Sequence, residues 1–268
     1  ILDLGVAWEI DVWGRLRRAS EAARADLLAS EQGRLTVILS LVSAVATTYV
    51  GLVDLDRQLE IAMRTALARG EFYRIFRLRF EGGVVSEVEV SQARSDYELA
   101  LASIPSLEKQ IAQQENALSV LLGRNPGPIL RGVTLDQLVL PQVPAGLPSE
   151  RLERRPDLRQ AEQVLIAANA RIGVAKAAFY PSISLTGALG TASSSMSNLF
   201  TGPARTWSYA ANVSQPIFSG GALRGQLAVA EAQREQALLQ YQKAIQTAFQ
   251  EVSDALIDQA KTREQLAA

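Results

Sequence analysis

A helical pattern without a proline runs from residue 15 to residue 80 and constrains the fold of this chain more than any other feature. Apolar side chains recur there at three- and four-residue spacing, which is the repeat of one helix face. A single helix over this range would extend about 100 Å at 1.5 Å per residue. Soluble domains rarely contain such a helix outside coiled coils. Gly33, Gly51 and Gly70 lie inside the pattern, and we expect a bend or a close helix contact at each.

Part of this helix is apolar enough to suggest a membrane span. Residues 35–53 carry no charge across 19 positions, which approaches the length of a transmembrane helix. Serines and threonines interrupt the segment, however, and the amphipathic repeat continues on either side of it. These two features favour a buried stretch of a helical assembly over a bilayer span.

The chain is expected to reverse at residues 80–88, where paired glycines are typical of a helix end. Ser86 and Glu89 then have the spacing of a capping box that opens the next helix. The returning helix is expected to reach Leu122, with a kink or a local loss of hydrogen bonds at Pro105. The sequence therefore predicts an antiparallel helical hairpin.

Period-two alternation predicts three strands, one in residues 1–14 and two within residues 181–218. Taken together, the strands have one face that is apolar and carries aromatic rings and another that is small or polar. A transmembrane β-barrel wall has this pattern, with lipid on one side and water on the other. An antiparallel sheet with one face packed on helices has the same alternation, so the pattern alone leaves both interpretations open.

The order of strand, glycine break and long helix occurs twice, and Gly14-Arg15-Leu16-Arg17 aligns with Gly221-Ala222-Leu223-Arg224. We interpret this as two structural repeats in a chain that is truncated at both ends, the first repeat lacking its opening part and the second its closing part. Two hairpins make four strands, whereas membrane barrels need at least eight. The barrel interpretation therefore requires a symmetric oligomer whose chains share the wall.

The composition excludes several classes of function. Lysine and arginine number 27 against 28 acidic residues, and this net charge of −1 argues against nucleic acid as a partner. The chain has no cysteine and no histidine, which removes cysteine nucleophiles, Ser-His triads, disulfides and most zinc sites. It has no phosphate-binding glycine loop and no evident acid–base pair of carboxylates. We therefore predict no enzyme activity, no cofactor and no metal site.

Three segments resemble the TolC-like outer membrane factor family, in its OprM-type branch of efflux channels: AWEIDVWGRLRRASEAA, RRPDLRQAEQVLIAANARIGVAKAAFYPSISLTGALG and TWSYAANVSQPIFSGGALRG. The resemblance covers essentially the whole chain. It implies a mainly α fold with transmembrane β structure, in a homotrimer in the outer membrane of a Gram-negative bacterium. Long antiparallel helical hairpins would form a periplasmic α-barrel, and a twelve-stranded β-barrel would be shared between the chains. The resemblance also implies a passive exit duct for drugs or other small toxic molecules, served by a periplasmic adaptor (membrane fusion) protein and an inner-membrane pump of RND type.

On this basis we divide the chain into six parts: a β-barrel strand (1–14), a long helical hairpin of the α-barrel (15–122, tip 80–88), an equatorial connector (123–156), a helix (157–180), a β-barrel hairpin (181–218) and the start of a second long helical hairpin (219–268). The second tip, which constricts the tunnel in this family, and the lipidated N-terminal cysteine common in this branch would lie outside these residues.

The resemblance assigns roles to three sets of residues. The adaptor-binding tip comprises Gly82, Gly83, Val84, Ser86 and Glu87. The barrel lumen is lined by Asp3, Glu9, Asp11, Ser184, Thr186, Ser208 and Asn212. The lipid-facing set is Trp8, Ile183, Leu185, Trp207 and Tyr209. A competing hypothesis is a soluble coiled-coil adaptor or scaffold with a small packed sheet, and the aromatic apolar face of all three strands argues against it.

Overall fold

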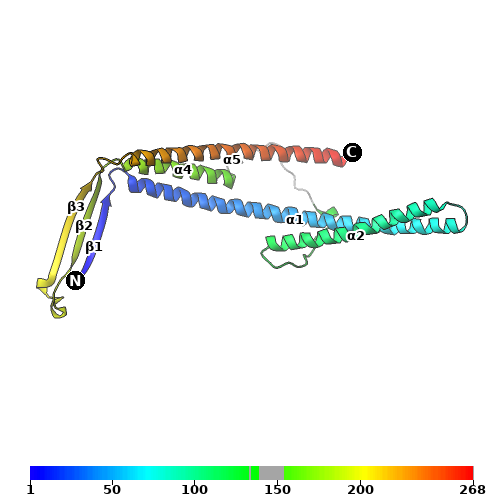
Figure 1. Ribbon diagram of the computed structural model, residues 1–268, viewed down its shortest axis with the longest axis horizontal. Helices are drawn as coiled ribbons and strands as arrows, with labels where there is room; N and C mark the ends of the chain where they lie inside the picture. Colours follow the sequence, from blue (N-terminus) through cyan, green and yellow to red (C-terminus); the bar gives the residue numbers. More distant parts are fainter. Residues whose placement is uncertain (133, 139–153, 268) are drawn as a thin grey trace. The chain divides into compact units, whose positions relative to one another are not determined.

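The structure is a computed structural model and describes residues 1–132, 134–138 and 154–267. The long elements of this part of the chain are β1 (Leu2–Ile10), α1 (Arg15–Glu81), α2 (Glu87–Leu121), α4 (Pro156–Ala177), β2 (Ser182–Thr191), β3 (Arg205–Ser214) and α5 (Ala222–Ala267), as Figure 1 shows. The chain divides into two compact units. The sheet unit contains residues 1–36 and 146–268, and the hairpin unit contains residues 37–145.

In the sheet unit, the three strands form an antiparallel sheet in the order β1-β2-β3. Leu185 of the central strand β2 pairs with Trp8 of β1 on one side and with Ala211 of β3 on the other. The strands have 9 or 10 residues, and a tilted transmembrane strand requires about 9–11. In Figure 1, α4 and α5 run away from one end of the sheet and do not cross its faces.

A glycine with a left-handed backbone directly precedes each of the two long helices that follow a strand, α1 and α5. Gly14 has a φ of +78° and Gly221 a φ of +90°, values that residues with a Cβ rarely adopt. Their carbonyl groups accept the first helical hydrogen bonds, from the amide of Arg18 at 2.8 Å and from that of Gly225 at 2.9 Å. The two repeats therefore share the same junction between strand and helix.

The helices of the sheet unit pack through alanine. Their buried side chains include Ala22, Ala25, Ala29, Ala167, Ala168, Ala170, Ala177, Ala230, Ala237 and Ala248. Side chains this small let helix backbones approach closely. A Cβ added at Gly173 of α4 would lie 2.9 Å from the Arg18 side chain, and one at Gly33 of α1 would lie 3.1 Å from the Gln160 side chain. The close contact predicted at Gly33 is therefore present.

In the hairpin unit, α2 begins with the predicted capping box. The Ser86 amide donates to the Glu89 carboxylate at 2.8 Å, and the Glu89 amide donates to the Ser86 hydroxyl at 3.4 Å. These hydrogen bonds hold the pKa of Glu89 below its usual range. Pro105 lies inside α2, which continues through it to Leu121.

The core of the hairpin unit is small and lies where α1, α2 and the segment after α2 meet. Leu52, Leu118 and Ile129 are buried together, with Val45, Tyr49 and Ile111 packed against them. At Gly51 an added Cβ would lie 3.1 Å from the Gln114 amide, and at Gly70 it would lie 2.9 Å from the Tyr97 ring. Both glycines therefore mark close contacts between the two helices, as predicted.

Among the described helices, α1 is the one long and apolar enough to cross a membrane, with an 18-residue stretch of mean hydropathy 2.0. Core helices of soluble proteins meet this criterion as well. Within the apolar segment 35–53, Leu52 and Val53 are buried in the hairpin unit. Most of the other side chains in this segment are exposed, so the burial expected there is present only at its C-terminal end.

Several element boundaries differ from the sequence predictions. β1 ends at Ile10 rather than at residue 14, because the chain turns there and the Val12 amide donates to the Ile10 carbonyl at 3.0 Å. The helix predicted at 157–180 spans Pro156–Ala177, with the proline in its first turn. β3 ends at Ser214, before the predicted limit at 218. The predicted connector 123–156 lies in part outside the described residues.

Candidate functional site

The register of the sheet gathers the predicted lipid-facing residues on one face. Residues paired across antiparallel strands point to the same side of a sheet. The set of Trp8, Ile183, Leu185, Trp207 and Tyr209 accordingly shares one side with Leu4, Leu189 and Val213. Trp207 is 72% exposed and Tyr209 is 80% exposed, and their rings stack with centroids 5.7 Å apart. The sheet therefore presents an aromatic, apolar and largely uncovered face, which we call the apolar face.

The opposite face carries most of the predicted lumen residues: Asp3, Glu9, Ser184, Thr186, Ser208 and Asn212. Glu9, Ser184 and Asn212 form one row across the three strands. Arg15, the first residue of α1, donates two hydrogen bonds to the Glu9 carboxylate, at 2.6 and 3.1 Å. The Glu9 charge is thus paired, and this polar face carries less free negative charge than the sequence suggests.

Asp11, the remaining residue predicted to line the lumen, lies just after β1 and outside the sheet. Its carboxylate accepts hydrogen bonds from the backbone amides of Leu16 at 3.0 Å and Arg17 at 2.9 Å. The first turn of a helix leaves such amides without helical partners and carries a positive partial charge. Asp11 therefore caps α1, and its place in the lumen stays a prediction.

An aromatic pair joins the two connections at the helical end of the sheet. The rings of Trp13 and Tyr180 stack with centroids 4.6 Å apart, and Trp13 Nε1 donates to the Pro181 carbonyl at 2.9 Å. Trp13 follows β1, and Tyr180 and Pro181 precede β2. The pair therefore ties the chain entering α1 to the chain leaving α4. Sequence reasoning did not assign a role to Trp13.

The two aromatic pairs lie near opposite ends of the sheet. Trp207 pairs with Leu189, which lies nine positions after Tyr180, or about 30 Å along an extended chain at 3.3 Å per residue. With a strand tilt of about 40°, this length spans about 23 Å across a membrane. Outer-membrane barrels have an apolar band about 25 Å tall between two aromatic girdles. The spacing of these pairs matches that band.

The predicted tip residues Gly82, Gly83, Val84, Ser86 and Glu87 all lie in or beside the turn between α1 and α2. Gly83 has a φ of +72°, and its amide donates to the Phe80 carbonyl at 2.9 Å. The Val84 amide donates to the Arg79 carbonyl at 2.9 Å, which completes a Schellman motif. Val84 is 76% exposed. The tip is thus a defined turn with an uncovered apolar side chain.

Arg131 links the two helices of the hairpin unit, a role that sequence reasoning missed. Its Nε and Nη2 donate to the Asp56 carboxylate of α1 at 2.7 and 3.1 Å. Its Nη1 donates to Glu115 of α2 and to the Ile129 carbonyl. The hydrogen bond from the Arg131 guanidinium holds the pKa of the Glu115 carboxyl below its usual range. Asp56 and Arg131 lie 75 positions apart in the chain, so no local pattern could have revealed the pair.

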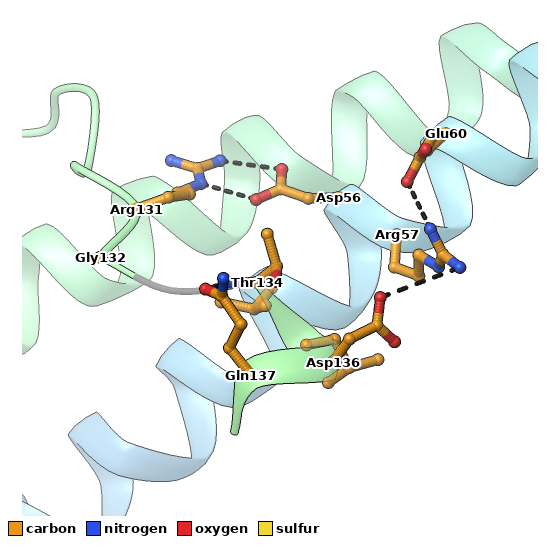
Figure 2. A pocket seen from close by; sticks show the side chains of 10 residues that line it. Asp56, Arg57, Glu60, Arg131, Gly132, Thr134, Asp136 and Gln137 are labelled. Carbon is orange, nitrogen blue, oxygen red and sulfur yellow. Dashed lines mark hydrogen bonds and ion pairs between the residues drawn. The ribbon is translucent and has the colours of Figure 1, made fainter. Parts of the chain in front are cut away.

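Figure 2 shows the pocket of about 310 Å³ beside Arg131. Arg57, on its wall, pairs with Glu60 at 2.7 Å and lies 4.0 Å from Asp136. Every charged side chain that lines the pocket is therefore paired with another protein residue. A pocket of this kind offers no free charge to a ligand, and we assign it a structural role. In the described residues, no group of three or more acidic side chains is placed to hold a metal ion.

Comparisons with known proteins find similarity to outer membrane efflux proteins. The profile of the outer membrane efflux protein family matches residues 2–124 and 147–268. The chain is 42% identical over 267 residues to the probable efflux pump outer membrane protein TtgC of Pseudomonas putida. The aligned region covers 99% of this chain and 55% of that relative. It is 37% identical over 266 residues to the cation efflux system protein CusC of Escherichia coli K12, covering 99% and 58%. The chain thus spans a little over half the length of these relatives.

Solved structures agree with the sequence comparison. A crystal structure of CusC superposes with a TM-score of 0.90 at 37% identity, covering 99% of this chain and 62% of that one. The open state of the Neisseria gonorrhoeae MtrE outer membrane channel superposes with a TM-score of 0.88 at 34% identity, covering 98% and 60%. The fold, the two-sided sheet and the family profile lead to one conclusion. This chain belongs to the outer membrane efflux protein family.

Proposed function

We propose that the protein is a passive exit duct in the outer membrane of a Gram-negative bacterium. The observation that carries this proposal is the sheet, whose apolar face is aromatic and exposed whereas its other face is small and polar. Within the described residues, β1 and β3 each pair with β2 alone. Unpaired strand edges are unfavourable in a bilayer, and closing the wall into a barrel removes them. Three chains with four strands each would close a twelve-stranded barrel.

The roles of the residues follow from this arrangement. The apolar face, including Trp8, Ile183, Leu185, Trp207 and Tyr209, contacts lipid. The polar face, including Asp3, Glu9, Ser184, Thr186, Ser208 and Asn212, lines the lumen. We propose that the duct performs no chemistry, in keeping with relatives that are named as efflux proteins. Its selectivity then arises from the charge and width of the passage.

The partners are a periplasmic adaptor protein and an inner-membrane pump of RND type. The exposed tip of Gly82, Gly83, Val84, Ser86 and Glu87 is the surface that we assign to the adaptor, since it combines a rigid turn with an uncovered valine. Relatives are named for the efflux of toluene, solvents, antibiotics and cations. By analogy, we propose small toxic molecules as the cargo of this duct.

A soluble coiled-coil scaffold is the competing function. It requires the apolar face of the sheet to pack against helices, and the exposure of Trp207 and Tyr209 disfavours such packing.

Light scattering on the full-length protein, with and without a nonionic detergent, tests the proposal. A particle that needs detergent and contains three chains is expected. A monodisperse monomer or dimer in plain buffer would contradict the duct and favour the scaffold.

A matched pair of variants tests the orientation of the sheet. Leu185→Arg places a charge on the apolar face, which costs about 2–4 kcal/mol in a bilayer interior, and we expect a large loss of trimer from the membrane fraction. Ser184→Arg places the same charge on the polar face, one residue away, and should leave the trimer in the membrane. Equal assembly of the two variants would contradict lipid contact.

A further inference from the structure

An arginine stands on the apolar face of the sheet, at the end farthest from the helices. Arg205 is the first residue of β3 and pairs with Thr191, which in turn pairs with Leu2. Trp207 and Tyr209 follow it on the same face. A charged side chain beside two aromatic rings is unfavourable in a lipid-facing position unless it reaches the interface or meets a partner.

The described part of the chain provides no partner for this charge. Across the described residues, no hydrogen bond or ion pair joins the Arg205 side chain to another residue. Asp3 is the other charged residue that lines the hollow beside Arg205. By the register, however, Asp3 belongs to the polar face, and no ion pair connects the two. The guanidinium therefore has all its donors available.

A hollow beside Arg205 is shaped by apolar groups. It has a volume of about 580 Å³, and its wall includes Leu4, Leu189 and the ring of Phe200. Phe200 comes from the loop between β2 and β3, which Figure 1 shows at the end of the sheet away from α4 and α5, and it is 75% exposed. A hollow with an apolar wall and a cation at its rim fits an amphiphile, with acyl chains against the wall and an anionic headgroup on the guanidinium. The Asp3 carboxylate, which also lines the hollow, belongs by register to the polar face.

We propose that Arg205 and the adjoining hollow bind the phosphate-bearing headgroup of a membrane lipid in the leaflet away from the helical tunnel. Arginine matches phosphate geometry because its planar fork donates two parallel hydrogen bonds. The stacked rings of Trp207 and Tyr209 come next along β3, toward the helices, at the depth where an aromatic girdle meets the headgroups. The inference rests on the proposed function, because it requires the apolar face to contact lipid.

The test uses the full-length protein in a nonionic detergent and measures its thermal unfolding midpoint while a lipid is added. The probe is a phosphatidic acid, and the same diacylglycerol without phosphate is the comparison lipid. A basic residue near an anionic membrane contributes about a five-fold gain in affinity. We expect phosphatidic acid to raise the midpoint more than diacylglycerol does, and its half-saturating concentration to rise about five-fold in Arg205→Gln.

Two further variants complete the test. Arg224→Gln removes an exposed arginine of α5, outside the sheet, and should leave the half-saturating concentration unchanged. Arg205→Lys keeps the charge without the fork and should lie between the wild type and Arg205→Gln. It also serves as the readout if Arg205→Gln does not assemble.

Three outcomes would overturn the inference. One is an unchanged response in Arg205→Gln, and another is an equal response to diacylglycerol. The third is an equal shift with inorganic phosphate at the same concentration, since that would identify a site for soluble anions. Light scattering on the same samples separates this inference from the proposed function, because a detergent-dependent trimer that ignores phosphatidic acid would contradict the lipid site alone.

Discussion

Replacing Arg131 by methionine is expected to loosen the segment that follows α2. The substitution keeps an apolar stem of similar length and removes the guanidinium. The lost hydrogen bonds are those to the carboxylates of Asp56 and Glu115 and to the Ile129 carbonyl. Among the described residues, Arg131 alone has a side chain that donates hydrogen bonds to α1, to α2 and to this segment. We therefore expect the loss of stability to be confined to this part of the hairpin unit.

The magnitude follows from the burial of the groups. The side chains of Arg131, Asp56 and Glu115 are 29%, 33% and 19% exposed, so solvent screens the ion pairs in part. Exposed ion pairs contribute about 0–1 kcal/mol, whereas hydrogen bonds to charged groups contribute about 1.5–3 kcal/mol. For this partly buried network we expect a loss of about 2 kcal/mol, which corresponds to about a 30-fold change in the local opening equilibrium.

Native-state hydrogen exchange of the full-length protein in detergent measures this opening directly. Two amides report on it. The Ile129 amide donates to Glu115 at 3.1 Å, and the Gly132 amide donates to the Tyr49 hydroxyl at 2.9 Å. Both amides should exchange about 30-fold faster in Arg131→Met, whereas amides in the tip between α1 and α2 should be unaffected.

Arg57→Met is the matched control, because Arg57 lines the same pocket. Its hydrogen-bonded partner Glu60 lies one turn away on the same helix, and such exposed pairs contribute about 0.5 kcal/mol or less. We expect less than a three-fold change at the two reporter amides. Equal acceleration in the two variants, or none in Arg131→Met, would refute the assignment of Arg131 as the link.

Three further predictions concern single positions. At Gly190 an added Cβ would lie 2.4 Å from a β1 carbonyl oxygen, so Gly190→Ala should lower the thermal unfolding midpoint. Gly5→Ala, with open space around its Cβ, should not lower it, and similar midpoints for the two variants would contradict the close approach of the strands. Gly83→Ala should destabilise the tip by about 1 kcal/mol because of the positive φ, whereas Gly82→Ala, at a position without a positive φ or a close contact, should not destabilise it. Hydrogen exchange of the turn amides would reveal the difference. The pKa of Asp157 is held low by the hydrogen bond that its carboxylate accepts from Arg155. The stabilisation of α4 by this carboxylate is therefore present above the unfolded pKa of about 3.9 and is lost as the pH falls through the lower folded value. Circular dichroism across this range should show the loss of helix in the wild type and no such loss in Asp157→Asn.

The local elements were predictable because their signals are local. The Ser86 and Glu89 spacing predicted a capping box that the structure contains. The alternation in residues 1–14 predicted β1, although the strand stops at Ile10. Asp11 continues the alternating pattern by one residue, and period two cannot distinguish a strand residue from a helix cap. Only the position of α1 reveals that the Asp11 carboxylate meets helix amides.

Residue periodicity and the glycine breaks were enough to determine the long hairpin, the three strands and their two unlike faces, because each depends on side chains a few positions apart. The tertiary structure alone decided which distant residues meet. The salt link from Arg131 to Asp56 depends on how the chain returns on itself. The position of Arg205 beside a hollow with an apolar wall also depends on the tertiary structure. Contacts of this kind have no sequence period, since folding and not spacing brings the partners together.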